Sequence, residues 1–183
     1  IDLNEYETAE MKVETYLGAG SGIYMSTEAI YMTAPVYMPI TTSTNAMMDS
    51  SMLVMDSNTA LYKFTVDSTN IEMKARTTIE GSVLNQFSMD EYNGYLRVAT
   101  TTGNAWGRDG DSNNHLMIYD ENLNEVGKLT DLARGERIYS ARFIGDKAYI
   151  VTFRETDPLF VIDVADPKNP TVLGELKIPG FSN

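Results

Sequence analysis

The stretch that decides the fold is RFIGDKAYIVTFRETDPLFVIDVADPKNPTVLGELKIPG, which covers residues 142–180. It contains three short apolar runs and a fourth, mixed run, separated by Gly, Asp, Asn and Pro, and it ends on Pro-Gly. Runs of β-branched and aromatic residues between such turn formers predict short strands. Together with the residues just before it, the stretch predicts four strands, at roughly 138–144, 147–153, 159–164 and 171–178.

The same pattern occurs three times in the chain. Each copy begins with a strand, a tight polar turn and a second strand, as in IYMSTEAIYMTA (23–34), FSMDEYNGYLRVAT (87–100) and RFIGDKAYIVTF (142–153). Each copy continues with a strand, an Asp/Asn turn, a fourth strand and a closing glycine. These glycines are Gly81, Gly135 and Gly180, spaced 54 and 45 residues apart. Four-stranded units of this length are typical of β-propeller blades, which stack side by side around an axis.

We therefore predict an all-β fold with about three four-stranded antiparallel propeller blades, as part of a larger ring. The blades are placed at 23–81, 82–135 and 136–180. Residues 181–183 read as the start of a next blade, and residues 1–22 as a short helix or a strand of a preceding blade. Ordinary propellers have roughly four or more blades. Either the chain is a fragment of a longer ring, or copies of it associate to close one.

A long insertion at 34–60 separates the second and third strands of the first blade. It is rich in methionine and contains Met38, Met47, Met48, Met52 and Met55. Thioethers are ligands for soft metals such as copper, and methionine is also common on adaptable contact surfaces. Because the spacing of these residues is irregular, we favour a loop in which they fill gaps under the blade.

The composition limits the classes of function. The chain has no cysteine, which excludes disulfides, thiolate zinc sites and cysteine nucleophiles. Its formal net charge is -12, and a surface of this sign repels nucleic acid and anionic lipid. No apolar run approaches the length of a membrane helix, so we expect no direct membrane insertion of this segment. The first residue is Ile1 rather than Met, which favours a processed or excised piece of a longer protein.

Three long ungapped stretches carry a family resemblance: ALYKFTVD (60–67), LNQFSMDEYNGYLRVATTTG (84–103) and GERIYSARFIGDKAYIVTFRETDPLFVIDVADPKNPTVLGELKIPGFSN (135–183). They resemble an uncharacterised family of secreted bacterial and archaeal proteins with a C-terminal β-propeller domain, distantly related to WD-repeat propellers. The resemblance implies a propeller fold and an extracytoplasmic location, either secreted or tethered to the cell surface. It implies no known activity and therefore no catalytic residues. The family domain continues beyond the IPGFSN sequence.

The most informative loop is GNAWGRDGDSNNH, residues 103–115. Asp109, Asp111 and Asn113 alternate in it, which places three oxygen atoms on one side of a tight turn, as in calcium-binding loops. The match to an EF-hand loop is partial, because Asn114 stands where that loop needs glycine. The alternative is a polar hairpin loop whose Asp and Asn side chains cap their own backbone. Calcium is therefore a candidate cofactor, with these three residues as its candidate ligands.

Four residues are candidate ligand contacts on the loop face, where the second and third strands of each blade are connected. Trp106 and Arg108 belong to the 103–115 loop, and Arg154 and Asp157 belong to the corresponding loop of the last blade. Tryptophan and arginine are typical of binding hot spots. The alternatives are that Trp106 packs into a neighbouring blade and that the arginine–carboxylate pairs hold blades together.

His115 is the only histidine, and no patterned serine accompanies it, so the sequence does not indicate a Ser-His-Asp hydrolase. We predict a non-catalytic, extracytoplasmic binding or scaffolding module, with a protein or glycan partner at the loop face. The competing hypothesis is a calcium-dependent ligand binder or enzyme that uses the 103–115 loop. A third alternative is a structural spacer for another domain of the parent chain.

Overall fold

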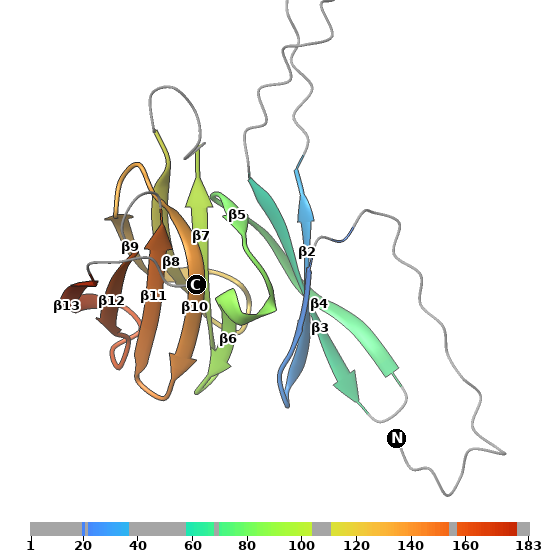
Figure 1. The fold of residues 1–183 in the computed structure, drawn as a ribbon. Coiled ribbons are helices and arrows are strands. Elements are labelled where there is room, and N and C mark those ends of the chain that lie inside the picture. Colours follow the sequence, from blue (N-terminus) through green and yellow to red (C-terminus); the bar gives the residue numbers. More distant parts are fainter. Residues whose placement is uncertain are drawn as a thin grey trace, which may run out of the picture.

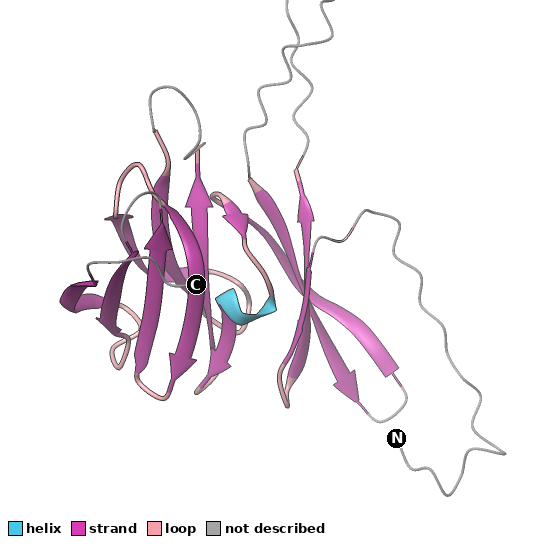
Figure 2. Cartoon of the chain, in the orientation of Figure 1, coloured by secondary structure: helices cyan, strands magenta, loops and turns pink. Residues whose placement is uncertain are grey.

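The computed structural model describes residue 20 and residues 22–36, 58–67, 70–103, 111–153 and 157–178, without the side chains of Asp157 and Ile178. These residues form three antiparallel sheets, which we call blades 1, 2 and 3 in chain order (Figure 1; Figure 2). The predicted all-β fold of four-stranded blades is thereby confirmed. The methionine-rich part of the insertion, 37–57, lies outside the described residues. Within those residues no helix has the length and apolar character that a membrane crossing would need.

Blades 1 and 3 each contain four strands in simple chain order. Blade 1 consists of β1 (Gly22–Met25), β2 (Ala29–Pro35), β3 (Thr59–Asp67) and β4 (Asn70–Ile79). Blade 3 consists of β10 (Arg137–Ile144), β11 (Lys147–Phe153), β12 (Asp157–Asp163) and β13 (Thr171–Ile178). Since every strand pairs with the next, the first strand of each blade lies at one edge and the fourth strand at the other.

Blade 2 differs in its innermost strand, which is split into two short pieces. The blade consists of β5 (Ser82–Val83), β6 (Met89–Tyr92), β7 (Tyr95–Thr102), β8 (Asn113–Tyr119) and β9 (Glu125–Leu132). Both β5 and β6 pair with β7, and the 3₁₀ helix η1 (Gln86–Ser88) lies between them. The expectation of a strand starting at Phe87 was therefore wrong by two residues. Asn85 stabilises the helical turn instead, because its side chain accepts a hydrogen bond from the Phe87 backbone N–H at 2.9 Å.

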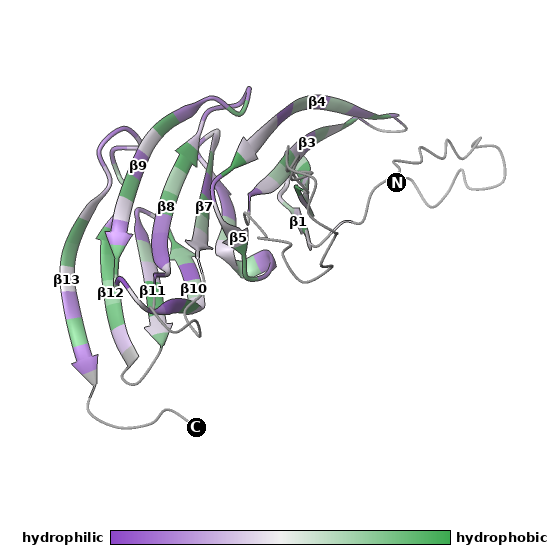
Figure 3. Ribbon diagram, turned by 90° about the horizontal axis from the view of Figure 1, so that it is seen from above, coloured by the Kyte–Doolittle hydropathy of each residue, from purple (hydrophilic) through white to green (hydrophobic). Residues whose placement is uncertain are grey.

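The three blades radiate from a common centre. Seen from above in Figure 3, β1, β5 and β10 lie nearest that centre, and β4, β9 and β13 lie at the outer rim. Buried side chains of blade 2 pack on both sides. Leu116 and Ile118 of β8 join a core with blade 3, whereas Met117 and Tyr119 of the same strand join a core with blade 1. The alternation of side chains along a strand thus makes blade 2 the central layer.

Glycine is important at two places in the backbone, a tight turn in blade 2 and a close approach between blades 2 and 3. Asn93 and Gly94 both have positive φ angles, 51° and 81°, and form the two-residue turn between β6 and β7. The tight polar turn expected within FSMDEYNGYLRVAT (87–100) therefore consists of these two residues. At the outer rim, a Cβ atom on Gly127 of β9 would collide with the carbonyl oxygen of Pro167, in the turn between β12 and β13. Glycine at this position allows blades 2 and 3 to touch through their main chains.

Candidate functional site

The predicted loop face can be located from the ends of the strands. In Figure 1, β2, β7 and β11 all end at the upper end of the molecule, so the connections that follow them start on one face. Trp106, Arg108, Asp109 and Arg154 lie outside the described residues. Asp157 opens β12, but its side chain also lies outside the description. The ligand-binding role of these residues therefore remains a prediction.

Two of the three candidate calcium ligands are described. The Asn113 side-chain amide donates a hydrogen bond to the Asp131 carboxylate at 2.6 Å. This bond and a second one from the Thr130 hydroxyl hold the pKa of Asp131 below its usual value. The Asn113 Oδ1 atom is buried and has no hydrogen-bond partner. The described residues contain no group of three His, Cys, Asp or Glu side chains placed to hold a metal ion. Calcium binding that includes Asp109 stays a prediction.

A buried polar cluster fixes the base of the loop face. Asn114 is fully buried and donates from its amide to the Leu132 carbonyl at 2.9 Å, while its Oδ1 accepts from Thr101 at 2.7 Å. Ser112 donates to the Glu136 carbonyl at 2.7 Å, and the Thr152 hydroxyl donates to the Glu136 carboxylate. These bonds tie the connection between blades 2 and 3 to β8 and β11. They have a structural role, because each polar group is satisfied within the fold.

His115 is not arranged as a catalytic base. Its side chain is 4% exposed, and its Nε2 atom lies 3.1 Å from the Thr102 hydroxyl. Burial lowers the pKa of His115, so the ring is neutral at pH 7. Its Nδ1 atom has no partner, so no carboxylate orients the imidazole as in a catalytic triad.

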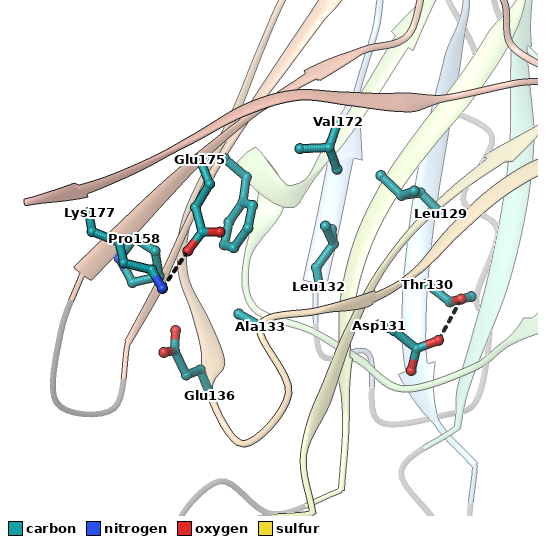
Figure 4. A pocket seen from close by; sticks show the side chains of 11 residues that line it. Leu129, Thr130, Asp131, Leu132, Ala133, Glu136, Pro158, Val172, Glu175 and Lys177 are labelled. Atoms are coloured by element: carbon teal, nitrogen blue, oxygen red, sulfur yellow. Dashed lines mark hydrogen bonds and ion pairs between the residues drawn. The ribbon is translucent and has the colours of Figure 1, made fainter.

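A groove of about 440 Å³ lies between blades 2 and 3 (Figure 4). Leu129, Leu132, Phe160 and Val172 supply apolar surface, and Asp131, Glu136, Glu175 and Lys177 supply charge. The Lys177 amine pairs with Glu175 at 3.3 Å, as the dashed line in Figure 4 shows. Since Asp131 and Glu136 also have partners in the protein, all three carboxylates of this groove are engaged. The groove offers a shaped, acidic surface rather than a free reactive group.

One buried ion pair and one buried arginine connect the blades near the opposite end. The Lys63 amine of blade 1 lies 3.2 Å from the Glu91 carboxylate of blade 2, and Ser26 donates a hydrogen bond to the same carboxylate. Burial alone would raise the pKa of Glu91, but the bonds from Ser26 and Lys63 outweigh it, so the pKa lies below its usual value. Arg97 binds the Asp90 carboxylate and donates to the Gly145 carbonyl of blade 3 at 2.6 Å.

Sequence reasoning missed these residues as well as Asn114. The signal that it could have used is a charged residue within an otherwise apolar strand, such as Arg97 in YLRVA. A charge at a buried strand position needs a partner, and the partner must come from a neighbouring strand or blade. The role of arginine–carboxylate pairs in joining blades stays a prediction, because Arg97 and Asp90 both belong to blade 2 and only the hydrogen bond from Arg97 to the Gly145 carbonyl reaches blade 3.

The architecture and these contacts define a class of protein: radiating four-stranded sheets held together by buried polar bridges form a β-propeller. The family model described as a beta propeller domain matches residues 1–183, and the chain belongs to this family.

Two archaeal proteins are similar to it. An uncharacterised protein of Methanocaldococcus jannaschii is 60% identical over 124 residues, and one of Archaeoglobus fulgidus is 52% identical over 125 residues. Each match covers 68% of this chain but 19% of the relative, so the matched part spans about a fifth of those proteins.

Proposed function

We propose that this chain is a non-catalytic binding or scaffolding module. One observation carries the proposal: the two buried cationic side chains of the described residues, Lys63 and Arg97, connect blades and line neither of the two cavities. Lys63 pairs with Glu91, and Arg97 pairs with Asp90 and with a carbonyl of blade 3. A general acid at neutral pH needs a raised carboxyl pKa. The described carboxyl groups with a shifted pKa are all shifted downward: Glu80, Glu91, Asp120, Asp131, Asp163 and Asp166.

The loop face is the proposed binding surface, and a protein or a glycan is the proposed partner. Loops on a rigid scaffold are the usual place for recognition. The polar cluster around Asn114 supplies such a scaffold, because it fixes the strand ends from which the loops start. We place the module outside the cytoplasm, secreted or at the cell surface. The lack of cysteine and the resemblance to secreted proteins support this location.

A calcium-dependent version of this function is the second candidate. The buried, unpartnered Oδ1 atom of Asn113 favours it, since an unsatisfied buried oxygen is a suitable cation ligand. Asp131 adds a carboxylate beside Asn113 that the sequence pattern did not include.

The test is a binding screen with matched variants. The labelled chain is screened against a glycan array and a displayed peptide library, and each hit is repeated with the double variant Trp106→Ala, Arg154→Gln. We expect the double variant to lose the hits, while Arg76→Gln, an exposed arginine on β4, keeps them. Hits that survive the double variant, or screens with no hits above a scrambled control, would contradict a loop-face binding module.

A further inference from the structure

A second cavity lies at the inner edges of the blades, away from the loop face. It has a volume of about 380 Å³ and receives residues from all three blades. Tyr24 and Met25 come from β1, Phe87 from η1, Asp90 from β6, and Arg142 and Phe143 from β10. A cavity of this size accommodates a small ligand or two to three side chains of a partner, at the lower end of roughly 300–1,000 Å³ for ligand sites.

The helical turn η1 gives this cavity its apolar platform. It interrupts the innermost strand of blade 2, where blade 3 has the uninterrupted strand β10. The interruption brings Phe87 beside β1 and β10, and the Asn85 cap fixes the turn. Phe87 remains 49% exposed, and Met25 across the cavity is 64% exposed. Two exposed apolar side chains thus face one cavity on a rigid base.

Arg142 supplies a positive charge at the same place. Its guanidinium lies 4.2 Å from the centre of the Phe87 ring and donates one hydrogen bond, to the Ala141 carbonyl at 2.7 Å. Among the described residues, no carboxylate forms an ion pair with Arg142. Asp90 lines the cavity as well, but its carboxylate is bound by Arg97. Arg142 is therefore the charged side chain of the cavity lining that no ion pair within the described residues neutralises, in a chain whose formal charge is -12.

We propose that this inner cavity binds a peptide segment in which an acidic side chain stands next to an aromatic one. The guanidinium, held over Phe87, presents N–H donors to the carboxylate, and Phe87 with Met25 receives the aromatic ring. Arginine, aromatic residues and methionine are the residues enriched at protein interfaces. At physiological salt, charges beyond about 8 Å are largely screened, so the local arginine outweighs the distant acidic surface.

The experiment uses the methionine methyl groups as reporters. Methyl-labelled protein is titrated with N-acetyl-Asp-Phe amide, and the shifts of Met25 and Met89, which line the cavity, are followed. We expect saturable shifts at these two methyl groups, and about fivefold weaker binding of N-acetyl-Asn-Phe amide, because one charge-assisted contact is lost. Arg142→Gln should remove the difference between the two peptides, and Arg142→Lys should retain part of it. Arg76→Gln is the matched control.

Several results would overturn the proposal. One is equal binding of the Asp and Asn peptides, and another is an unchanged preference in Arg142→Gln. Saturable shifts confined to Met32 and Met73, on β2 and β4, would place binding elsewhere. Phenylacetate that binds as tightly as the Asp peptide would identify a small carboxylate as the ligand instead. Because probe and reporters are at the inner cavity, a negative result leaves the loop-face function standing.

Discussion

Strand β8 of blade 2 and strand β11 of blade 3 each lie between two other strands of their sheet, yet they differ in burial. Residues from Asn114 to Tyr119 of β8 are all buried, whereas β11 alternates between buried and half-buried residues along its whole length. Both sequences are rich in apolar residues, so composition does not explain the difference. Blade 2 has a neighbour on each face, and the described residues provide blade 3 with a neighbour on one face only. Burial in this fold is therefore set by the neighbouring blade.

The largest expected effect is the difference in the free energy of unfolding between two leucine variants. One leucine lies on a sheet face that a neighbouring blade covers, and the other lies on the face of blade 3 that no described residues cover, which we call its open face. Leu116 of β8 is fully buried, whereas Leu159 of β12 is half-buried on the face of blade 3 that points away from blade 2. Leu116→Ala should lower the free energy of unfolding by about 3 kcal/mol, and Leu159→Ala by about 1 kcal/mol. Urea unfolding of both variants measures this. Equal losses would mean that the open face of blade 3 is covered in solution.

The second prediction compares how much a buried ion pair and an exposed ion pair contribute to stability. Glu91→Gln leaves the buried Lys63 amine without its counter-charge and should cost about 2 kcal/mol. Glu175→Gln, at the exposed pair with Lys177, should change stability by less than about 0.5 kcal/mol. Urea midpoints at pH 7 give both values. A similar cost for the two variants would contradict the structural role of the Lys63–Glu91 pair.

The same pair predicts a dependence on pH. The pKa of Glu91 in the folded protein lies below its ordinary value of 4.5. The ionised Glu91 carboxylate therefore contributes its full stabilisation at pH values above its ordinary pKa. This contribution is lost as the pH falls through the pKa that Glu91 has in the folded protein. The wild-type urea midpoint should drop between pH 6 and pH values below about 4, and the drop should be smaller in Glu91→Gln. Parallel curves for the two proteins would show that Glu91 makes no such contribution.

The third prediction concerns two glycines on outer strands. Gly127→Ala places a methyl group against the Pro167 carbonyl and should cost about 1–3 kcal/mol, because the two main chains must move apart. Gly174→Ala on β13 meets no atom within 4 Å and should be close to neutral. Thermal unfolding distinguishes the two. If Gly127→Ala leaves the thermal stability unchanged, blades 2 and 3 separate easily at the rim.

The smallest expected effect concerns calcium at the 103–115 loop. If Asp111 contributes a ligand, millimolar calcium should raise the melting temperature by about 2 °C, and a chelator should reverse the change. Asp111→Ala should abolish the response, whereas Asp146→Ala, in the exposed turn between β10 and β11, should keep it. If neither calcium nor the chelator changes the melting temperature of the wild-type protein, calcium is no longer a candidate cofactor.

The sequence predicts most of the fold because its signals are local. The turn residues and strand formers of 142–180 place β10, β11, β12 and β13 to within about two residues of their ends. The 3₁₀ turn was missed because Phe87 itself is a good strand former. Asn85, a favoured cap residue, was the available signal.

The sites are less predictable because they depend on contacts between blades. Lys63 and Glu91 are 28 residues apart and meet only once blades 1 and 2 pack together. Arg142 and Phe87 likewise belong to different blades, so no spacing in the sequence marks their cavity. For the candidate loop contacts Trp106, Arg108, Arg154 and Asp157, the binding screen is the test.

Gly127 has a consequence for the geometry of a complete ring. Sheets that fan out from a common centre form wedges, and the angle of each wedge depends on how far apart the outer edges stand (Figure 3). The contact between Gly127 and Pro167 brings the outer edges of blades 2 and 3 together and so keeps that angle small. A smaller angle requires more wedges to complete a full turn. One hydrogen atom in place of a methyl group thus favours a wider ring with more blades.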